Sequence, residues 1–500
     1  MTADGGCDGV PFSASREAFE EIVGWLDGAE AAGLDHGDLE DELSVRGREV
    51  LRRLLQDHLS LRSAKEERVD VVDIDGTTHG SVERDHSRLL ASVFGEVEFV
   101  RLAYRHRGHP NLHPGDAALN LPVERHSHGL RRLAAIESAR GSFGEAVEAI
   151  CRATGVGVGK RQVEELAHRA AGDVEAFYEA AKAPATERGD VVVLSVDAKG
   201  IVMRPDALRP ATARAAARAS TKLTTRLSRG EKSNRKRMAE VGAVYDVTPV
   251  ARTSADVMVS KHGDEPPPPA PEAKNKWITA SVADEATEVI GRVFDEAHRR
   301  DRRHARPWVA LVDGNRHQID AIRAEAAKRN VKVPVLVDYV HVLEYLSAAA
   351  WCFFAEGTPA AEEWVRDRAM AVLEGNAKAV AAGIRRRLTA ENVAKSKRKK
   401  ADDAARYLTN NAAYLDYPTA LAQGLPIATG IIEGTCRFLV KDRMAITGAR
   451  WNVEGAEAVL KLRAVKSNGD FDNYWKFHTA EEHRRNHEDR YDDRVIPLAA

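Results

Sequence analysis

The stretch V-V-V-L-S-V-D-A-K-G at residues 191–200 is almost entirely apolar up to Asp197, and W-V-A-L-V-D-G at residues 308–314 reaches Asp313 in the same way. Apolar runs of this length, rich in β-branched residues, predict strands buried on both faces of a sheet. Ligand sites of α/β sheets lie near strand ends, where each run places its aspartate. We therefore expect two carboxylates that could share divalent cations. Each aspartate alone could instead be a strand-end turn or helix-cap residue.

The composition limits the classes of protein to which the chain can belong. Its 500 residues, 43% of them hydrophobic, allow roughly two to four domains with real cores. No stretch approaches the roughly 18 to 20 apolar residues of a membrane helix, and residues 1–11 lack a signal pattern. The cysteines Cys7, Cys151, Cys352 and Cys436 are far apart, which indicates neither a disulfide framework nor a cysteine zinc site. We expect a cytoplasmic protein.

Charge is unevenly distributed along the chain, although the formal net charge is only −2. Between Arg204 and Arg237, eleven Lys or Arg stand against two acids, and between Arg385 and Lys400 eight stand against one. Local charge is what a binding partner meets. Such runs either form solvated faces or neutralise phosphates, which gives sequence-independent affinity for nucleic acid.

The first 185 residues are predicted to form three regions. Apolar residues at three- and four-residue spacing predict helices in 15–65, and helical periodicity returns in 129–183. Alternating apolar and charged residues predict strands at 68–74 and 95–104, with a turn at Gly76. The predicted regions are an N-terminal helical region (1–66), a small strand-rich region (67–124) and a region with a helix-turn-helix (125–185).

The predicted helix-turn-helix consists of helices 142–150 and 160–171, which flank the glycine-rich stretch T-G-V-G-V-G at 154–159. The second helix would begin with side chains that can reach phosphates or base edges in a major groove: Lys160, Arg161 and Gln162. Many helix pairs with a tight turn bind nothing, so DNA binding and simple packing both remain open.

The pattern of apolar runs over residues 191–338 predicts an α/β catalytic core with a mixed sheet. Three strands, a helix, a strand, a helix and a strand match the ribonuclease H-like order. The predicted elements are strands 191–197, 238–247 and 277–282, helix 286–300, strand 307–313, helix 318–329 and strand 333–338.

The remaining sequence predicts a helical insertion followed by completion of the core. The core would run over 186–342, an all-helical insertion domain over 343–425, the core completion over 426–480 and a charged tail over 481–500. Within the completion, the helix-like stretch I-I-E-G-T-C-R-F-L-V carries one acid, Glu433, among apolar residues. Glu433 is the candidate third carboxylate.

Three acids kept together suit phosphodiester cleavage. A two-metal site needs hard oxygen ligands for two Mg²⁺ ions about 4 Å apart, which activate the nucleophile and stabilise the leaving oxygen. We expect Asp197 to bridge both metals, Asp313 to hold one and Glu433 the other. Glu433 alone could instead form a salt bridge to Arg437, one turn further on.

Several motifs resemble the ISKra-type insertion-sequence transposases, members of the DDE superfamily. The resemblance covers about residues 67–480. Its motifs are F-G-E-V at 94–97, R-G-S-F at 140–143, V-D-A-K-G at 196–200, N-R-K-R-M-A-E-V at 234–241, V-D-G-N at 312–315, D-Y-V-H at 338–341, T-G-I-I-E-G-T-C-R at 429–437, G-A-R-W at 448–451, E-G-A-E-A-V-L-K-L-R at 454–463 and S-N-G-D-F at 467–471.

The resemblance implies a DNA transposase in which Asp197, Asp313 and Glu433 match the family's catalytic D, D and E and bind two Mg²⁺ ions, with Mn²⁺ as a possible substitute. Asp338 and His341 match a D-x-x-H element found in similar, Mutator-like transposases. His341 could contact the scissile phosphate or the flanking DNA, or the pair could brace the fifth strand.

The expected partners are double-stranded DNA, both the terminal inverted repeats of the element and target DNA, and a second copy of the chain, because pairing two DNA ends usually requires at least two active sites. On DNA the protein would be associated with the bacterial nucleoid. Besides the three residues of the helix-turn-helix, we expect DNA contacts from Lys199, Lys232, Arg235, Lys236, Arg237, Arg437, Lys441 and Arg443.

Two other functions remain open. A ribonuclease H-like nuclease or resolvase would cleave DNA in Mg²⁺ without joining strands. A catalytically silent DNA-binding protein derived from a transposase would keep the core as a scaffold only. The presence of all three acids argues against the second.

Three further features have a simpler interpretation. The motif H-x-x-H-x-x-x-H at 106–113 could ligate zinc, but no cysteine accompanies it, and we expect solvated or DNA-facing histidines. Asp70, Asp73 and Asp75 are expected on an exposed strand and turn. Trp451 and Trp475 are expected in the core rather than stacked on bases.

Overall fold

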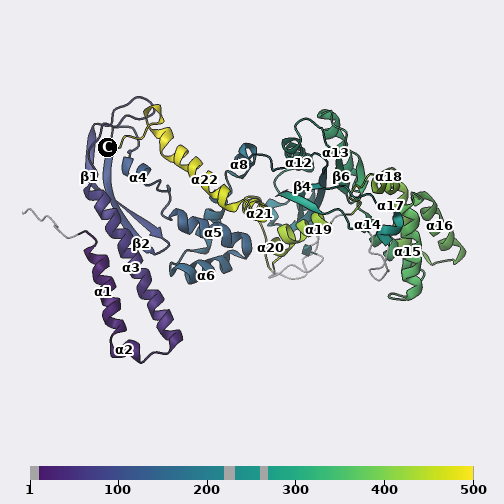
Figure 1. Ribbon diagram of the computed structural model, residues 1–500, viewed down its shortest axis with the longest axis horizontal. Coiled ribbons are helices and arrows are strands. Elements are labelled where there is room, and N and C mark those ends of the chain that lie inside the picture. Colours follow the sequence, from purple (N-terminus) through teal and green to yellow (C-terminus); the bar gives the residue numbers. More distant parts are fainter. Residues whose placement is uncertain are drawn as a thin grey trace, which may run out of the picture. The chain divides into compact units, whose positions relative to one another are not determined.

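The structure of the protein is a computed structural model that describes residues 11–218, 231–232, 234–258, 268–428, 430–446 and 448–498. The chain folds into two compact units (Figure 1): unit 1 comprises Met1–Glu179 and Gly469–Ala500, and unit 2 comprises Ala180–Asn468. The C-terminal segment therefore belongs to the same unit as the N-terminal segments. No helix in the described ranges is long and apolar enough to cross a membrane.

Unit 1 begins with helices that confirm the predicted helical region, and a β-hairpin follows. Leu59 of the long third helix is buried together with Val97 and Phe99 of the hairpin, because apolar residues of both elements face one small core. These elements are α1 (Ser13–Leu26), α2 (Ala29–Ala32), α3 (His36–Ala64), β1 (Ser81–Ser92) and β2 (Gly95–Arg105).

The prediction of a strand at 68–74 is wrong. Only isolated bridges form there, because the Asp73 side chain accepts hydrogen bonds from the backbone N–H groups of Asp75 (3.0 Å) and Thr77 (2.8 Å). Such local bonds favour a turn over a strand ladder. The hairpin strand β1 escapes prediction because its middle, E-R-D-H-S-R, is polar and mostly exposed.

The rest of unit 1 is helical. The helices expected over 129–183 are present, whereas the helix at 471–486 spans residues that the sequence assigned to the core completion and a charged tail. Ser142 and Glu145 form a capping box at the start of α6, and Gly155, with φ +71°, ends that helix in the left-handed conformation. Arg131 is fully buried and forms ion pairs with Glu124 and Glu482. The helices are α4 (Pro114–Ala118), α5 (His128–Arg140), α6 (Phe143–Thr154), α7 (Lys160–Ala170), α8 (Val174–Ala180) and α22 (Phe471–Asn486), followed by the short turns η4 (Glu488–Arg490) and η5 (Asp492–Arg494).

Unit 2 is built on a five-stranded mixed sheet in the order β5-β4-β3-β6-β7. The pairs β5–β4 and β4–β3 are antiparallel, whereas the pairs β3–β6 and β6–β7 are parallel. The predicted mixed α/β core is thus present. The strands are β3 (Val191–Val202), β4 (Lys236–Val247), β5 (Ala273–Ser281), β6 (Trp308–Val312) and β7 (Val335–Val337).

The helices α12 (Ala286–Arg300) and α13 (Arg316–Lys328) follow β5 and β6 in sequence, at the predicted places. Gly242, which pairs with Val196 across β4 and β3, allows α12 to approach closely, because a Cβ atom at this position would overlap Val293. The even-numbered side of β3 therefore faces α12.

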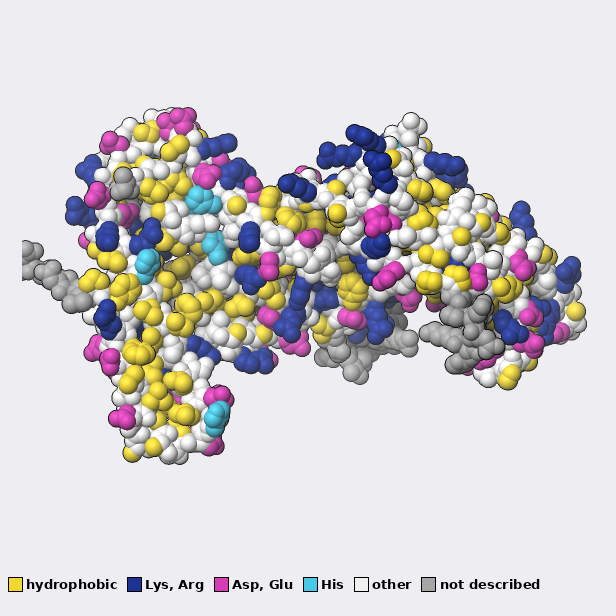
Figure 2. Space-filling view, viewed as in Figure 1, with side chains coloured by type: hydrophobic (Ala, Val, Ile, Leu, Met, Phe, Trp, Pro, Cys, Tyr) yellow, Lys and Arg dark blue, Asp and Glu magenta, His cyan; other side chains and the backbone are white. Residues whose placement is uncertain are grey.

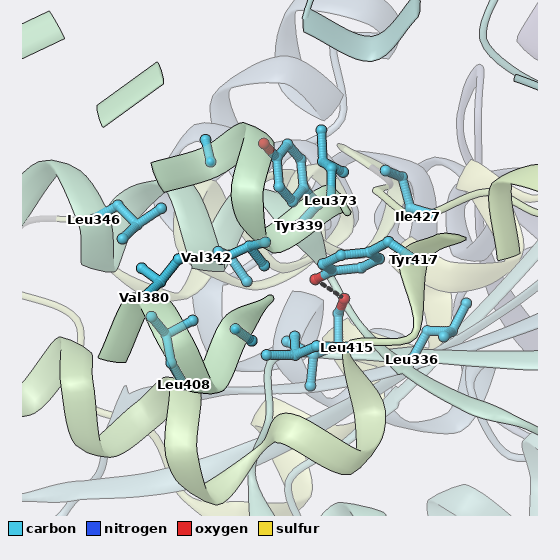
Figure 3. Close-up of a cluster of buried hydrophobic side chains, with 14 of the residues drawn as sticks. Leu336, Tyr339, Val342, Leu346, Leu373, Val380, Leu408, Leu415, Tyr417 and Ile427 are labelled. Atoms are coloured by element: carbon cyan, nitrogen blue, oxygen red, sulfur yellow. Dashed lines mark hydrogen bonds between the residues drawn. The ribbon is translucent and has the colours of Figure 1, made fainter. Parts of the chain in front are cut away.

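The odd-numbered side of the sheet packs against the predicted helical insertion. Val191, Val193, Val309 and Leu311 share one buried cluster with side chains of these helices. Figure 3 shows part of this cluster, including the hydroxyl of Tyr417, which donates a 2.7 Å hydrogen bond to the carbonyl of Val337. The insertion consists of α14 (Tyr339–Ala350), α15 (Pro359–Leu373), α16 (Ala377–Ala390), α17 (Lys395–Asn410), η2 (Ala412–Tyr414) and α18 (Tyr417–Ala422).

The predicted core completion is helical and returns to the sheet. Trp451 forms a bridge with Met203 just beyond β3, and Asn468 exchanges hydrogen bonds with Ile278 of β5. Trp451 and Trp475 are both buried, as expected. The helices are α19 (Gly430–Thr435), the π-helical turn η3 (Cys436–Lys441), α20 (Asp442–Met444) and α21 (Val453–Ser467).

The basic run 204–237 contains η1 (Pro205–Ala207) and α9 (Pro210–Arg218), and it continues into β4. Residues 219–230 and 233 of this run lie outside the described residues. A short helix, α11 (Ser254–Met258), follows β4. The second basic run, 385–400, forms the end of α16 and the start of α17.

Candidate active site at the end of the β3–β6 ladder

Asp197 and Asp313 lie side by side at the edge of the sheet in unit 2. Val196 pairs with Val312 in the parallel ladder between β3 and β6, and each aspartate is the next residue along the chain. Asp313 follows the last residue of β6, whereas Asp197 lies within β3, which continues to Val202 because it stays paired with β4. The predicted strand end at Asp197 is therefore wrong. Neighbouring residues in register on parallel strands point to the same face. Both carboxylates therefore lie on the odd-numbered face, at the rim of the cluster covered by the helical insertion.

Each carboxylate is held by a local backbone hydrogen bond. The N–H of Ala198 donates to Oδ1 of Asp197 at 2.6 Å, and the N–H of Asn315 donates to Oδ1 of Asp313 at 2.8 Å. The turn after Asp313 requires glycine, because Gly314 has φ +91° and a Cβ atom there would lie 3.0 Å from Tyr407 and Asn411. These bonds hold both side chains at the end of the β3–β6 ladder.

The pair concentrates negative charge. Burial is the main cause that raises the pKa of Asp313, and the charge of Asp197 raises it further, while His341 and the Asn315 hydrogen bond oppose the shift. Among the residues that the structure describes, neither aspartate forms an ion pair with Lys or Arg. Two close carboxylates without a cationic side chain are the donor set that a divalent cation favours.

The predicted third acid lies on a helix that contacts the same strand. Both α19 and η3 contact β3, and the thiol of Cys436 lies close enough to Asp197 to be affected by its charge. Burial, with the charge of Asp197 as the next cause, raises the pKa of this thiol well above its usual range. Glu433 is exposed and precedes Cys436 by three residues, hence by about one turn on a similar side of the helix.

The three acids do not form a tight set in this structure. Among the described residues, the one group of three acidic, His or Cys side chains with ligand atoms within 4.8 Å of one another is Asp73, His79 and His109. Asp197 and Asp313 are neighbours in the β3–β6 register, but the three acids together do not meet this distance. The alternative role of Glu433 was a salt bridge to Arg437. This salt bridge is not present, because no ion pair joins the two side chains in the described part of the chain.

Asp338 and His341 occupy the start of α14, next to β6. The N–H of Asp338 donates to the carbonyl of Val312 at 2.8 Å, and its buried carboxylate accepts from the N–H of Val340 at 2.9 Å. Asp338 thus braces the strand end and caps the helix. His341 is partly exposed, and its Nδ1 lies 3.1 Å from a carboxylate oxygen of Glu344.

Glu240 is a half-buried acid near this site that the sequence interpretation did not single out. It stands opposite Ala198 in the β3–β4 ladder, on the face away from Asp197. Burial raises the pKa of Glu240, a hydrogen bond with Gln318 opposes this, and the charge of Asp197 raises it further. The signal that could have found it is its place in the motif N-R-K-R-M-A-E-V.

The residues predicted to bind DNA through the helix-turn-helix lie at the start of α7. Lys160 and Arg161 are exposed, and Arg161 is paired with Glu165 at 3.1 Å. Gln162 is also exposed, but its side-chain oxygen accepts a 3.0 Å hydrogen bond from the N–H of Gly159. This residue therefore caps the helix.

The DNA-binding residues predicted in unit 2 differ in exposure. Lys199, Lys236, Arg437 and Lys441 are exposed, and Lys232, Arg235 and Arg237 are half-buried. Arg237 donates to the carbonyl of Ala283 at 2.9 Å. Arg443 is only 2% exposed and lies over the ring of Trp451, so its guanidinium belongs to the interior. Figure 2 shows Lys and Arg side chains gathered near α20 and over α12 and α13.

No protein-family model matches this chain, and no curated protein is significantly similar to it.

Proposed function

We propose that the chain is a DNA transposase of the DDE type, with a ribonuclease H-like core that cuts the ends of an insertion sequence and joins them to target DNA. The adjacency of Asp197 and Asp313 on the parallel strands β3 and β6 carries this proposal. The strand order β5-β4-β3-β6-β7 and the acid-bearing helix that returns to β3 support it.

The carboxylates of Asp197 and Asp313 suit a site for two Mg²⁺ ions. Their oxygen atoms are hard ligands, and neither side chain has a cationic partner among the described residues. Asp197, Asp313 and Glu433 would hold the ions. When bound, the ions would supply Lewis-acid stabilisation of the phosphate and of the attacking and leaving oxygens. The backbone bonds from Ala198 and Asn315 orient the carboxylates for this task.

DNA recognition in this proposal uses both units. The pair α6 and α7 would act as a helix-turn-helix in which Lys160 and Arg161 reach the inverted repeat. Exposed basic residues near the acids, including Lys199 and Lys441, would contact phosphates. Two copies of the chain would pair the two ends of the element.

Cleavage of labelled DNA that carries the ends flanking the chain's own gene tests the proposal. In Mg²⁺ or Mn²⁺, Asp197→Asn and Asp313→Asn should lose cleavage by about 100-fold or more, while DNA binding persists, because each removes a charged ligand. Asp295→Asn is the matched control, since this aspartate is 68% exposed and belongs to the same unit.

Full cleavage by either active-site variant would contradict the assignment of these acids. Cleavage without joined products would favour a nuclease or resolvase. DNA binding without any metal-dependent cleavage by the unaltered protein would favour a catalytically silent DNA-binding protein.

A further inference from the structure

Unit 1 contains a cluster of one aspartate and two histidines, far along the chain from the acids of the sheet. His79 Nε2 lies 3.1 Å from Oδ2 of Asp73, and His109 Nδ1 lies 2.8 Å from the same oxygen. The three ligand atoms all lie within 4.8 Å of one another. Asp73 and His79 are buried, and His109 is partly buried. The sequence predicted that Asp73 would lie on an exposed strand and turn. This prediction is wrong for Asp73, because its side chain is buried.

The hydrogen bonds of His79 determine which of its nitrogens can bind a cation. Nδ1 lies 3.2 Å from the carbonyl of Tyr104, which can only accept, so Nδ1 carries the proton. In the neutral ring, Nε2 then has a lone pair directed at the carboxylate of Asp73, which is also an acceptor. Two acceptors 3.1 Å apart need a cation between them or a second proton on the ring.

A metal-ligating histidine usually donates its other N–H to a backbone carbonyl or a carboxylate, which fixes the tautomer and the ring orientation. His79 has this arrangement through Tyr104. Asp73 also has the support expected of a ligand, because its other oxygen accepts the N–H groups of Asp75 and Thr77. The cluster thus has both ligand atoms and a supporting shell.

We propose that Asp73, His79 and His109 bind a structural Zn²⁺ ion. Zinc takes imidazole nitrogen and carboxylate oxygen at about 2.0–2.2 Å, so neighbouring ligand atoms in a tetrahedral site lie about 3.3 Å apart. The two short ligand separations are close to that value. The mixed set of two imidazoles and one carboxylate favours zinc over Mg²⁺, which prefers oxygen ligands.

The ring of His106 lies beside the cluster, although its nitrogen atoms are not within 4.8 Å of all three ligand atoms. Its ring centroid lies 5.1 Å from that of His109 and 6.0 Å from that of His79. His113, the third histidine of H-x-x-H-x-x-x-H, does not belong to the cluster. Its Nδ1 bonds to the carbonyl of Leu102 at 3.1 Å, and its ring stacks on His86. The motif H-x-x-H-x-x-x-H therefore suggests a ligand, His113, that does not belong to the cluster.

The ion would add a further link between segments that already share a small apolar core, which includes Val71, Tyr104 and Tyr491. Asp73 and His79 belong to a turn without a strand ladder, and His109 belongs to the loop after β2. Asp73 also forms a bridge to the buried Tyr491 near the C-terminus of unit 1. Zinc at this point would stabilise the turn, the loop and the docking of the C-terminal segment together.

Metal analysis of the full-length protein, purified without a histidine tag and desalted, tests this proposal. We expect about one zinc per chain. His109→Ala and Asp73→Asn should each lower the zinc content at least about tenfold, while His113→Gln should retain it. Stripping with a chelator should lower the thermal unfolding midpoint of the unaltered protein and leave that of His109→Ala unchanged.

Replacement of zinc by Co²⁺ gives a second readout that does not depend on the buried His79. A tetrahedral nitrogen and oxygen site should show visible absorption in the unaltered protein and in His113→Gln, but not in His109→Ala. The proposal is contradicted if the purified chain neither holds nor takes up zinc, in which case protonated histidines pair with Asp73. Zinc retained by both His109→Ala and Asp73→Asn would also overturn it. Neither result bears on DNA cleavage.

Discussion

The hydroxyl of Tyr407 donates a 2.8 Å hydrogen bond to the backbone carbonyl of Asp313. This bond links α17 of the helical insertion to the end of β6. The ring of Tyr407 stacks on Tyr345 of α14, with ring centroids 4.0 Å apart. Burial raises the pKa of the Tyr407 hydroxyl far above its usual range, so the group remains a donor. The insertion thus helps to hold a proposed metal ligand in place.

We predict that Tyr407→Phe weakens catalysis more than it weakens folding. Loss of one hydrogen bond should cost about 1 kcal/mol of unfolding free energy. Cleavage should fall severalfold, up to about tenfold, and the Mg²⁺ concentration needed for half-maximal cleavage should rise, because Asp313 is held less firmly. A metal titration of cleavage measures this. An unchanged Mg²⁺ requirement would show that the bond has no effect on the site.

We predict that Glu433→Gln abolishes cleavage without destabilising the protein. Glu433 is exposed, so the unfolding free energy should change by no more than about 0.5 kcal/mol. Cleavage should fall by about 100-fold or more if this carboxylate is the third ligand. Glu454→Gln, which alters an exposed acid of α21, is the control for a simple change in charge. Normal cleavage by Glu433→Gln would exclude it from the catalytic set.

Two glycines of unit 2 make a matched pair for the packing of α12 on the sheet. Gly242→Ala should destabilise the unit by about 1–3 kcal/mol, because its Cβ would overlap Val293. Gly291→Ala, on α12 itself, meets no atom within 4 Å and should stabilise the helix by up to about 1 kcal/mol. Urea unfolding of both variants measures the difference. Equal effects would contradict the close approach of α12 to β4.

A further prediction concerns the stability of unit 1 in acid. Burial alone would raise the pKa of Asp173, but its bonds with His478 and Arg485 outweigh this and lower the pKa to about 2. Because the folded-state pKa is below the usual 3.8, the stabilisation is present above about pH 4 and is lost as the pH falls towards 2. The difference in unfolding free energy between the unaltered protein and Asp173→Asn should be roughly 1–2 kcal/mol at pH 6 and vanish near pH 2. A difference independent of pH would contradict this account.

The sequence was sufficient to predict the mixed sheet of unit 2, because β6 and the first half of β3 are continuous apolar runs that lead to an acid. It was not sufficient for the second half of β3, which continues past Asp197 to Val202. It was not sufficient for β1, whose charged residues hide the strand pattern. The proximity of Cys436 to Asp197 also lay beyond prediction, since it depends on how a distant helix returns to the sheet. The same holds for Asp73 and His109, which are brought together by the fold of a loop and a turn rather than by spacing.

Joining of DNA strands tests the central claim most directly. Short DNA duplexes that carry the ends of the element, with free 3′-hydroxyls, would be incubated with the unaltered protein, plasmid DNA and Mg²⁺. The account predicts plasmid molecules covalently joined to the labelled ends, and no such product with Asp197→Asn or Asp313→Asn. Cleaved DNA without joined product, or joined product from either variant at the rate of the unaltered protein, would contradict it.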